Sequence, residues 1–325
     1  MKVCVYGVGA IGGLFAARLA RGGVSVSGVA RGATLASLRE RGLVLIEGEA
    51  RRRIDIAASD DPAALGRQDV VIVAVKTTAI ESVAEGIAPL LTGDTVILSA
   101  MNGVPWWFFN GLADAPPGLR LPSLDPTGVL DRSMPASQVI GSVVHLSASS
   151  PEPGTVRHGA GRRVIIGAPA GPPDGRAEQV AELLRRGSFD VEVSDRIQRD
   201  IWYKLWGNMT MNPLSAITGA TLDRILDDTL VRQFATRCMR EAAQVGARIG
   251  LTITDDPEKR HEVTRALGAV RTSMLQDVDA GRGVELDALV TVVSELADAL
   301  AVPAPNIDAL LGLARLHARV RHLYP

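Results

Sequence analysis

The chain has 325 residues, of which 46% are hydrophobic, so it is long enough for two domains with sizeable cores. Its formal net charge is -1, with no long run of one sign, which argues against nucleic acid or a membrane surface as a partner. No apolar run approaches the ~18 residues that span a bilayer. The five histidines lack metal-ligand spacing, so we expect no metal. Cys4 and Cys238 lie in apolar surroundings and fit a reducing cytoplasm.

Short β-rich runs alternate with helical stretches in the first part of the chain. Residues 2–9 and 24–30 predict strands on either side of a helix that ends at Gly22–Gly23. Residues 69–76 are apolar inside, as expected for a strand covered on both faces, and residues 94–103 predict a further strand after a helix. This alternation predicts an α/β fold with an N-terminal Rossmann domain, whose sheet is parallel and doubly wound.

The pattern changes twice after the Pro/Gly-rich stretch at 105–135. Three runs, at 138–149, 154–159 and 162–168, predict strands added antiparallel to the sheet, before a helix and a strand that end near 194. From Asp195 onward, apolar residues recur at intervals of three and four, which predicts helices only. We therefore expect two domains, at 1–194 and 195–325.

The first strand runs into the segment "YGVGAIGG", in which Gly7, Gly9 and Gly12 form a G-x-G-x-x-G pattern. Such glycines allow a tight turn, the approach of a pyrophosphate to the backbone, and close packing of helix on strand. The helix N-terminus offers free N–H groups and a positive dipole end to the phosphates. A glycine turn kept only for packing is the alternative. The expected cofactor-binding residues are Gly7, Val8, Gly9, Ala10, Ile11 and Gly12.

Arg31 stands at the tip of the second strand, in "GVARG", where an acidic residue would bind the ribose 2′-hydroxyl of NAD. A guanidinium at this place suits a 2′-phosphate instead. The sequence therefore predicts NADPH over NADH, with a solvated arginine at a strand end as the alternative.

The segment "WYKLWGNMTMNPLSAITG" places Lys204, Asn208 and Asn212 in one row along a helix, because steps of four residues advance about 400°. The row borders an apolar stripe that contains Trp202 and Trp206. Buried amides without partners cost ~1–3 kcal/mol, a cost that a polar ligand would offset. A helix edge with a snorkelling lysine and amides that cap loops is the alternative.

The same segment resembles the K-L-x-x-N-x-x-x-N-P-L-x-A signature of the ketopantoate reductases (2-dehydropantoate 2-reductases). Three more segments agree in order: "VAVKTT" at 73–78, "AMNG" at 100–103, and "TSMLQDVDAGRGVELD" at 272–287. The resemblance extends over nearly the whole chain. It implies an NADP-binding Rossmann domain at 1–194 and an all-helical substrate and catalytic domain at 195–325.

The resemblance also implies roles for residues of the second domain. Lys204 would be the general acid, and Glu285 would hold the lysine and the substrate in register. Asn208 and Asn212 would bind the hydroxyl and carbonyl oxygens of the substrate, and Ser273 its carboxylate.

In the first domain, Asn102 would lie between nicotinamide and substrate, and Lys76 near the entry of the cleft. Each assignment has a structural alternative. Asn102 precedes a glycine and is a turn signal. Ser273 and Asp277, four residues apart, could pair within a helix, and Glu285 is expected to begin a helix whose dipole favours an acid.

The resemblance implies NADPH-dependent reduction of ketopantoate, a 2-oxo acid, to pantoate in pantothenate and coenzyme A biosynthesis. Two features depart from the family. Four adjacent aromatics, Trp106 to Phe109, favour a lid over the cleft or a homodimer contact. Val270 stands where members often have a substrate-binding Asn. A paralogous reductase of another 2-oxo or 3-oxo acid and a non-catalytic NADPH-binding regulator therefore stay as alternatives.

Overall fold

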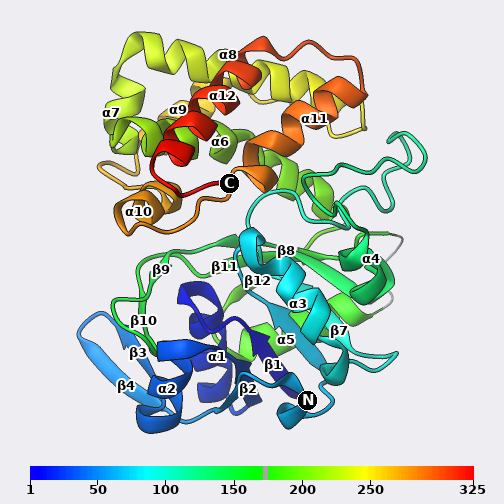
Figure 1. The fold of residues 1–325 in the computed structure, drawn as a ribbon, viewed down its shortest axis with the longest axis vertical. Coiled ribbons are helices and arrows are strands. Elements are labelled where there is room, and N and C mark those ends of the chain that lie inside the picture. The colour runs from blue at the N-terminus through cyan, green and yellow to red at the C-terminus, as the bar shows by residue number, and fades with distance from the viewer. Residues whose placement is uncertain (171–174) are drawn as a thin grey trace. The chain divides into compact units, whose positions relative to one another are not determined.

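The computed structural model describes residues 1–170 and 175–325 and divides into two compact units. The first unit comprises residues 1–111 and 127–200, and the second comprises residues 112–126 and 201–325. All described strands lie in the first unit, whereas the second contains helices and loops (Figure 1). The predicted α/β class with a helical C-terminal part is confirmed.

The main sheet of the first unit has eight strands in the order β12-β11-β8-β7-β6-β1-β2-β5. Neighbouring strands are parallel except β8 and β11, so the predicted doubly wound parallel sheet is confirmed. The run at 138–149 was expected to be antiparallel, but its strand pairs parallel with β7. The strands are β1 Lys2–Tyr6, β2 Ser25–Val29, β5 Ala57–Ser59, β6 Val70–Val73, β7 Val96–Ser99, β8 Val139–His145, β11 Arg163–Gly167 and β12 Asp190–Val193.

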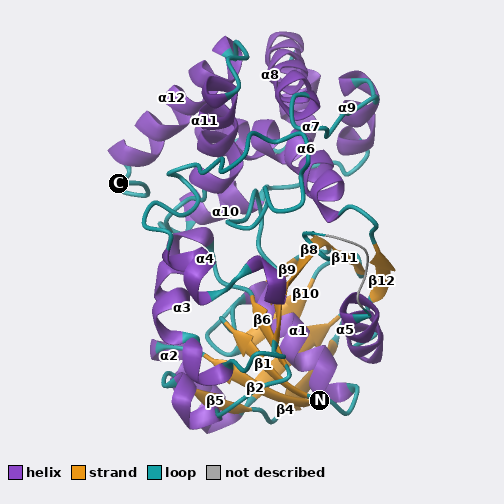
Figure 2. Cartoon of the chain, turned by 90° about the vertical axis from the view of Figure 1, so that its right-hand side faces the viewer, coloured by secondary structure: helices purple, strands orange, loops and turns teal. Residues whose placement is uncertain are grey.

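Helices cover both faces of this sheet (Figure 2). Val3 and Val5 of β1 belong to one core with α1 (Ala10–Arg21) and α5 (Arg176–Arg186). Tyr6 points to the opposite face, where its hydroxyl lies against Gly86 at the end of α3 (Ile80–Gly86); a Cβ on that glycine would lie 2.8 Å from the hydroxyl oxygen. The alternating strand residues thus place α1 and α3 on opposite sides of β1.

A second sheet of four strands, in the order β4-β3-β10-β9, packs on α1. The expectation that residues 154–159 extend the main sheet is wrong, because their strand pairs parallel with β3. Val156 of the second sheet packs against Gly13 of α1, where a Cβ would lie 3.5 Å from the Val156 side chain. The strands are β3 Leu43–Glu47, β4 Ala50–Ile54, β9 Ala148–Ser149 and β10 Thr155–His158, and α2 (Gly32–Arg41) precedes β3.

The aromatic segment at 106–109 is largely internal. Trp107 and Phe108 are 0% exposed, and the indole N–H of Trp106 donates to the carbonyl oxygen of Met134 at 3.0 Å. The Trp107 ring lies on Gly141 of β8, where a Cβ would come within 2.3 Å of it. The expectation of a lid or dimer contact is therefore wrong for Trp107 and Phe108, because a strand glycine leaves a slot that the Trp107 ring fills. Trp106 and Phe109 are partly buried.

The second unit is built around α6, whose tryptophans pack against α8. The Trp206 indole N–H donates to the carbonyl oxygen of Met239 at 2.7 Å, and Gly246 leaves room for Trp202. The helix continues without interruption past Pro213. The helices are α6 Ile197–Thr218, α7 Leu222–Asp227, α8 Thr229–Ala247, α9 Pro257–Arg265, α10 Ser273–Asp279, α11 Val292–Ala299 and α12 Pro305–Val320; α4 (Val129–Ser133) belongs to the first unit.

Glu285 does not begin a helix. It lies in the loop after α10, two residues before a π-helical turn at Asp287–Thr291 that leads into α11. The prediction of a helix start at Glu285 is wrong by these two residues, so the helix dipole is not a sufficient reason for an acid there.

The described residues show neither a membrane-spanning helix nor a metal-binding cluster. None of their helices is long and apolar enough to cross a bilayer. They also contain no group of three or more His, Cys, Asp or Glu residues with the geometry to hold a metal ion.

Candidate functional site

The glycine turn has the geometry that a dinucleotide requires. Gly7 has φ +98°, a conformation that L side chains rarely adopt, and its N–H donates to the carbonyl oxygen of Val29 at 3.0 Å. A Cβ on Gly12 would lie 2.0 Å from the carbonyl oxygen of Gly7, so only glycine lets α1 approach the turn this closely. A Cβ on Gly9 would have no protein atom within 4 Å. The open face at Gly9 is where a pyrophosphate would approach the backbone.

The other residues of the turn divide between core and surface. Val8 is 7% exposed and packs over Gly28 of β2, while Ala10 and Ile11 are partly buried in the first turn of α1. The first N–H groups of α1 lack intrahelical partners and carry the positive end of its dipole. The predicted strand, glycine turn and helix therefore occur in the expected order, and their geometry fits a bound diphosphate.

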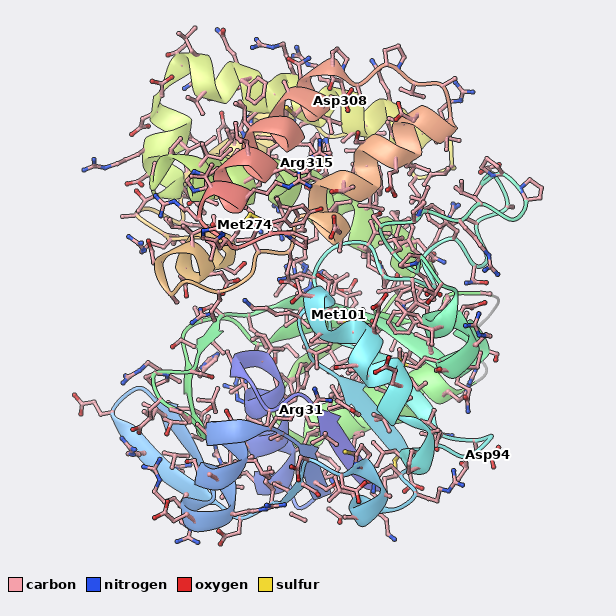
Figure 3. The ribbon with its side chains drawn as sticks, in the orientation of Figure 1. Arg31, Asp94, Met101, Met274, Asp308 and Arg315 are labelled. Atoms are coloured by element: carbon pink, nitrogen blue, oxygen red, sulfur yellow. The ribbon has the colours of Figure 1, made fainter. Side chains whose placement is uncertain are left out.

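Arg31 lies beside the glycine turn. It is exposed at the N-cap of α2, just after β2 (Figure 3). Burial raises the pKa of Tyr6, and the Arg31 guanidinium opposes this by its charge and a side-chain hydrogen bond. Since Tyr6 directly precedes Gly7, these contacts bring the guanidinium to the carboxyl end of β1. Sequence reasoning missed Tyr6, for which an aromatic before the first glycine was the only signal.

Lys76 and Asn102 follow the next two strands of the sheet. Lys76 comes after β6 and is the N-cap of a short 3-10 turn at Thr77–Ala79, and Asn102 comes after β7. Because β1, β6 and β7 are adjacent and parallel, both residues lie at the edge that holds the glycine turn. Ligands of doubly wound sheets bind at this carboxyl edge. Both side chains are partly buried.

Lys204, Asn208 and Asn212 all lie on the uninterrupted helix α6, so the predicted row exists. Asn212 is 6% exposed, and Lys204 and Asn208 are partly buried. Burial lowers the pKa of Lys204 from 10.5 to about 8, because a low-dielectric setting disfavours the ammonium. The Glu285 carboxylate acts in the opposite direction and raises that pKa. The second unit thus brings an acid from the loop after α10 near the lysine of α6.

Ser273 and Asp277 differ in exposure and in their contacts. Ser273 is the exposed first residue of α10, directly after Thr272, whose side chain caps the helix by accepting from the Leu275 N–H at 3.1 Å. Asp277 is 6% exposed and accepts from the Arg282 guanidinium at 3.0 Å. Asp277 therefore forms an ion pair with an arginine, while Ser273 remains accessible.

Two family models match most of the chain. The model for "Ketopantoate reductase PanE/ApbA" matches residues 3–171, and the model for its C-terminal domain matches residues 196–318. A curated 2-dehydropantoate 2-reductase from Mesorhizobium japonicum is 39% identical over 100% of both chains.

Solved structures with a similar fold point to the same family. One described as a ketopantoate reductase from Ralstonia solanacearum MolK2 has 51% identity, 99% coverage of both chains and a TM-score of 0.96. A 2-dehydropantoate 2-reductase from Geobacter metallireducens GS-15 has 26% identity and a TM-score of 0.85, with 97% of this chain and 99% of that chain covered. A D-mandelate dehydrogenase in complex with NADH has the same fold, at 19% identity, a TM-score of 0.86, and coverage of 99% and 100%. The chain belongs to the ketopantoate reductase (PanE/ApbA) family, and it is an oxidoreductase that uses a nicotinamide cofactor on a ketone or CH–OH group.

Proposed function

We propose that this enzyme reduces 2-dehydropantoate to pantoate with NADPH, a step of pantothenate and coenzyme A synthesis. The name of the 39% identical relative and the two family models support the substrate. The observation that carries the chemistry is the lysine of α6, whose pKa burial lowers to about 8 beside an acid.

The cofactor is held by the first unit. The backbone N–H groups of residues 7–12 bind its pyrophosphate, at the face that Gly9 leaves open. Arg31 pairs with the 2′-phosphate that distinguishes NADPH from NADH. Lys76 and Asn102, at the same edge of the sheet, complete the cofactor contacts, and Asn102 also contacts the substrate. The fold alone does not select the cofactor, because a dehydrogenase of this fold is in complex with NADH.

Lys204 acts as the general acid. The nicotinamide, when bound, supplies a hydride to the ketone carbon, so negative charge develops on the carbonyl oxygen. The Lys204 ammonium donates a proton to that oxygen, which contributes roughly 10²–10⁴ to the rate. With a pKa near 8, the group is mostly charged at neutral pH and still releases its proton readily. Glu285 raises the pKa of Lys204 and so keeps the lysine protonated.

Asn208, Asn212 and Ser273 bind the oxygens of the substrate. An amide both donates and accepts, so the two asparagines suit the hydroxyl and carbonyl oxygens of one ligand. The Ser273 hydroxyl, exposed at the start of α10, binds the carboxylate. Orientation of this kind places the ketone carbon and the proton donor in reacting geometry.

A second substrate class has support at Val270. Its side chain is 41% exposed in the loop before α10, three residues from Ser273. An apolar group there would favour a 2-oxo acid with a bulkier apolar tail over a substrate that carries an additional hydroxyl.

The test is NADPH oxidation with a series of oxo acids. Ketopantoate should give the highest kcat/KM, and Val270→Asn should change the ranking toward hydroxylated substrates. Highest activity with an apolar 2-oxo acid would favour the second class. Absence of turnover with every oxo acid would reject both.

A further inference from the structure

Glu285 belongs to a segment that is anchored on both sides. Its neighbours Val284 and Leu286 are 2% and 1% exposed, while Glu285 itself is only partly buried. Leu286 also accepts hydrogen bonds from the N–H groups of the π-helical turn, including that of Val290 at 2.8 Å. The backbone at Glu285 is therefore set by what contacts the residues beside it.

The residues after α12 supply those contacts. The carbonyl oxygen of Leu323, a residue 8% exposed, accepts from the Val284 N–H at 3.0 Å. The Tyr324 hydroxyl donates to Oδ1 of Asp287 at 2.5 Å, and the Thr291 hydroxyl donates to the same oxygen at 3.1 Å. Leu323 contacts Val284, one residue before Glu285. Tyr324 contacts Asp287, two residues after Glu285. The segment after α12 therefore contacts the chain on both sides of the acid.

Tyr324 is suited to a permanent donor role. Burial, the hydrogen bond to Asp287 and the charge of Asp287 raise its pKa to about 12. Two arginines of α12 also face it: Arg315 opposes this rise by its charge, and the Arg319 guanidinium lies 5.7 Å from the ring centroid. The hydroxyl therefore stays protonated over the range in which Lys204 titrates.

We propose that Tyr324 is a positioning residue, which through Asp287 and the neighbouring backbone holds Glu285 at the distance from Lys204 that the reaction needs. This inference rests on the proposed role of Lys204 as general acid.

The consequence appears at Lys204. The Glu285 carboxylate raises the pKa of Lys204, so a displaced Glu285 raises it less. Tyr324→Phe keeps the ring but removes the hydroxyl, and it should lower the pKa of Lys204 below that of the wild type. A displacement near 1 Å should also lower kcat roughly tenfold or more, with the Kd for NADPH unchanged.

The experiment measures Lys204 without turnover. The lysine is labelled with acetic anhydride across a pH series and its peptide is quantified by mass spectrometry, which reports the pKa directly. Tyr203→Phe is the matched control, because that hydroxyl also donates to a carboxylate, Asp255, at 2.7 Å in the same unit. Tyr324→Phe should shift the labelling curve of Lys204 to lower pH, whereas Tyr203→Phe should leave it unchanged.

A second variant tests the route. Asp287→Ala should reproduce the shift, and the double variant should add nothing beyond the larger single effect. An unmoved labelling curve in Tyr324→Phe, an equal shift in Tyr203→Phe, or additive effects in the double variant would each overturn the proposal. Failure of the wild type to reduce any oxo acid would instead count against the proposed function, because labelling needs no substrate.

Discussion

Lys204→Met should make the protein more stable at neutral pH while abolishing activity. An unperturbed lysine has a pKa of 10.5, whereas Lys204 has a pKa of about 8 in the folded protein. The unfolded chain therefore binds this proton more tightly. Each tenfold change in a protonation equilibrium corresponds to roughly 1.4 kcal/mol, so the charged ammonium costs the fold up to about 3 kcal/mol. Methionine has similar length and no charge, so it removes this cost.

The pH dependence follows with a definite sign. Below about pH 8 the lysine is charged in both states, and the cost is fully present. Between about 8 and 10.5 the folded chain loses the proton first, so the contribution of this group to stability improves as pH rises. The advantage of Lys204→Met over the wild type should therefore be largest at neutral pH and decrease toward about pH 10.

Urea unfolding followed by circular dichroism measures both points. Lys259→Met, a change at an exposed lysine of α9, is the control and should alter stability by only about 0.5 kcal/mol. The reasoning would be refuted if Lys204→Met were no more stable than the wild type at neutral pH, or if its advantage did not decrease with rising pH.

Four further changes have expected outcomes. Gly9→Ala should fold normally yet bind NADPH weakly, because its methyl would occupy the open face. Gly12→Ala should lower thermal stability as well, because its Cβ would come within 2.0 Å of a carbonyl oxygen. Fluorescence titration of NADPH and thermal unfolding distinguish the two variants. Arg31→Ala should raise the KM for NADPH much more than that for NADH, and equal effects would argue against a 2′-phosphate contact. Glu241→Ala removes the carboxylate that accepts from the Ile307 N–H at 2.9 Å at the start of α12, so it should cost ~1–3 kcal/mol of stability while kcat below the unfolding temperature stays unchanged.

The parts of the fold that depend on local patterns could be predicted from sequence. The glycine turn, its strand and its helix are contiguous, and four-residue steps are enough to place Lys204, Asn208 and Asn212 in a row. The domain boundary, the homodimer and the cytoplasmic location stay predictions, as do the roles of the individual site residues.

The parts that depend on distant pairings could not be predicted. The strand at Thr155–His158 joins Leu43–Glu47, far away in sequence, and nothing in its own residues specifies that partner. The sequence around Trp107 predicts an exposed aromatic, and only the structure shows that Gly141 of β8 lies beneath its ring. In the same way, the contact between Tyr324 and Asp287 has no signal in the spacing of either residue.

The central claim is that the Lys204 ammonium delivers the proton. The most direct measurement is the pH profile of kcat for ketopantoate reduction by the wild type and by Lys204→Ala, with NADPH binding measured separately. The wild type should lose turnover as pH rises through about 8, and the variant should be slower by roughly 10²–10⁴-fold with an unchanged Kd for NADPH. Retained turnover in Lys204→Ala, or a wild-type profile that stays flat well above pH 8, would contradict it.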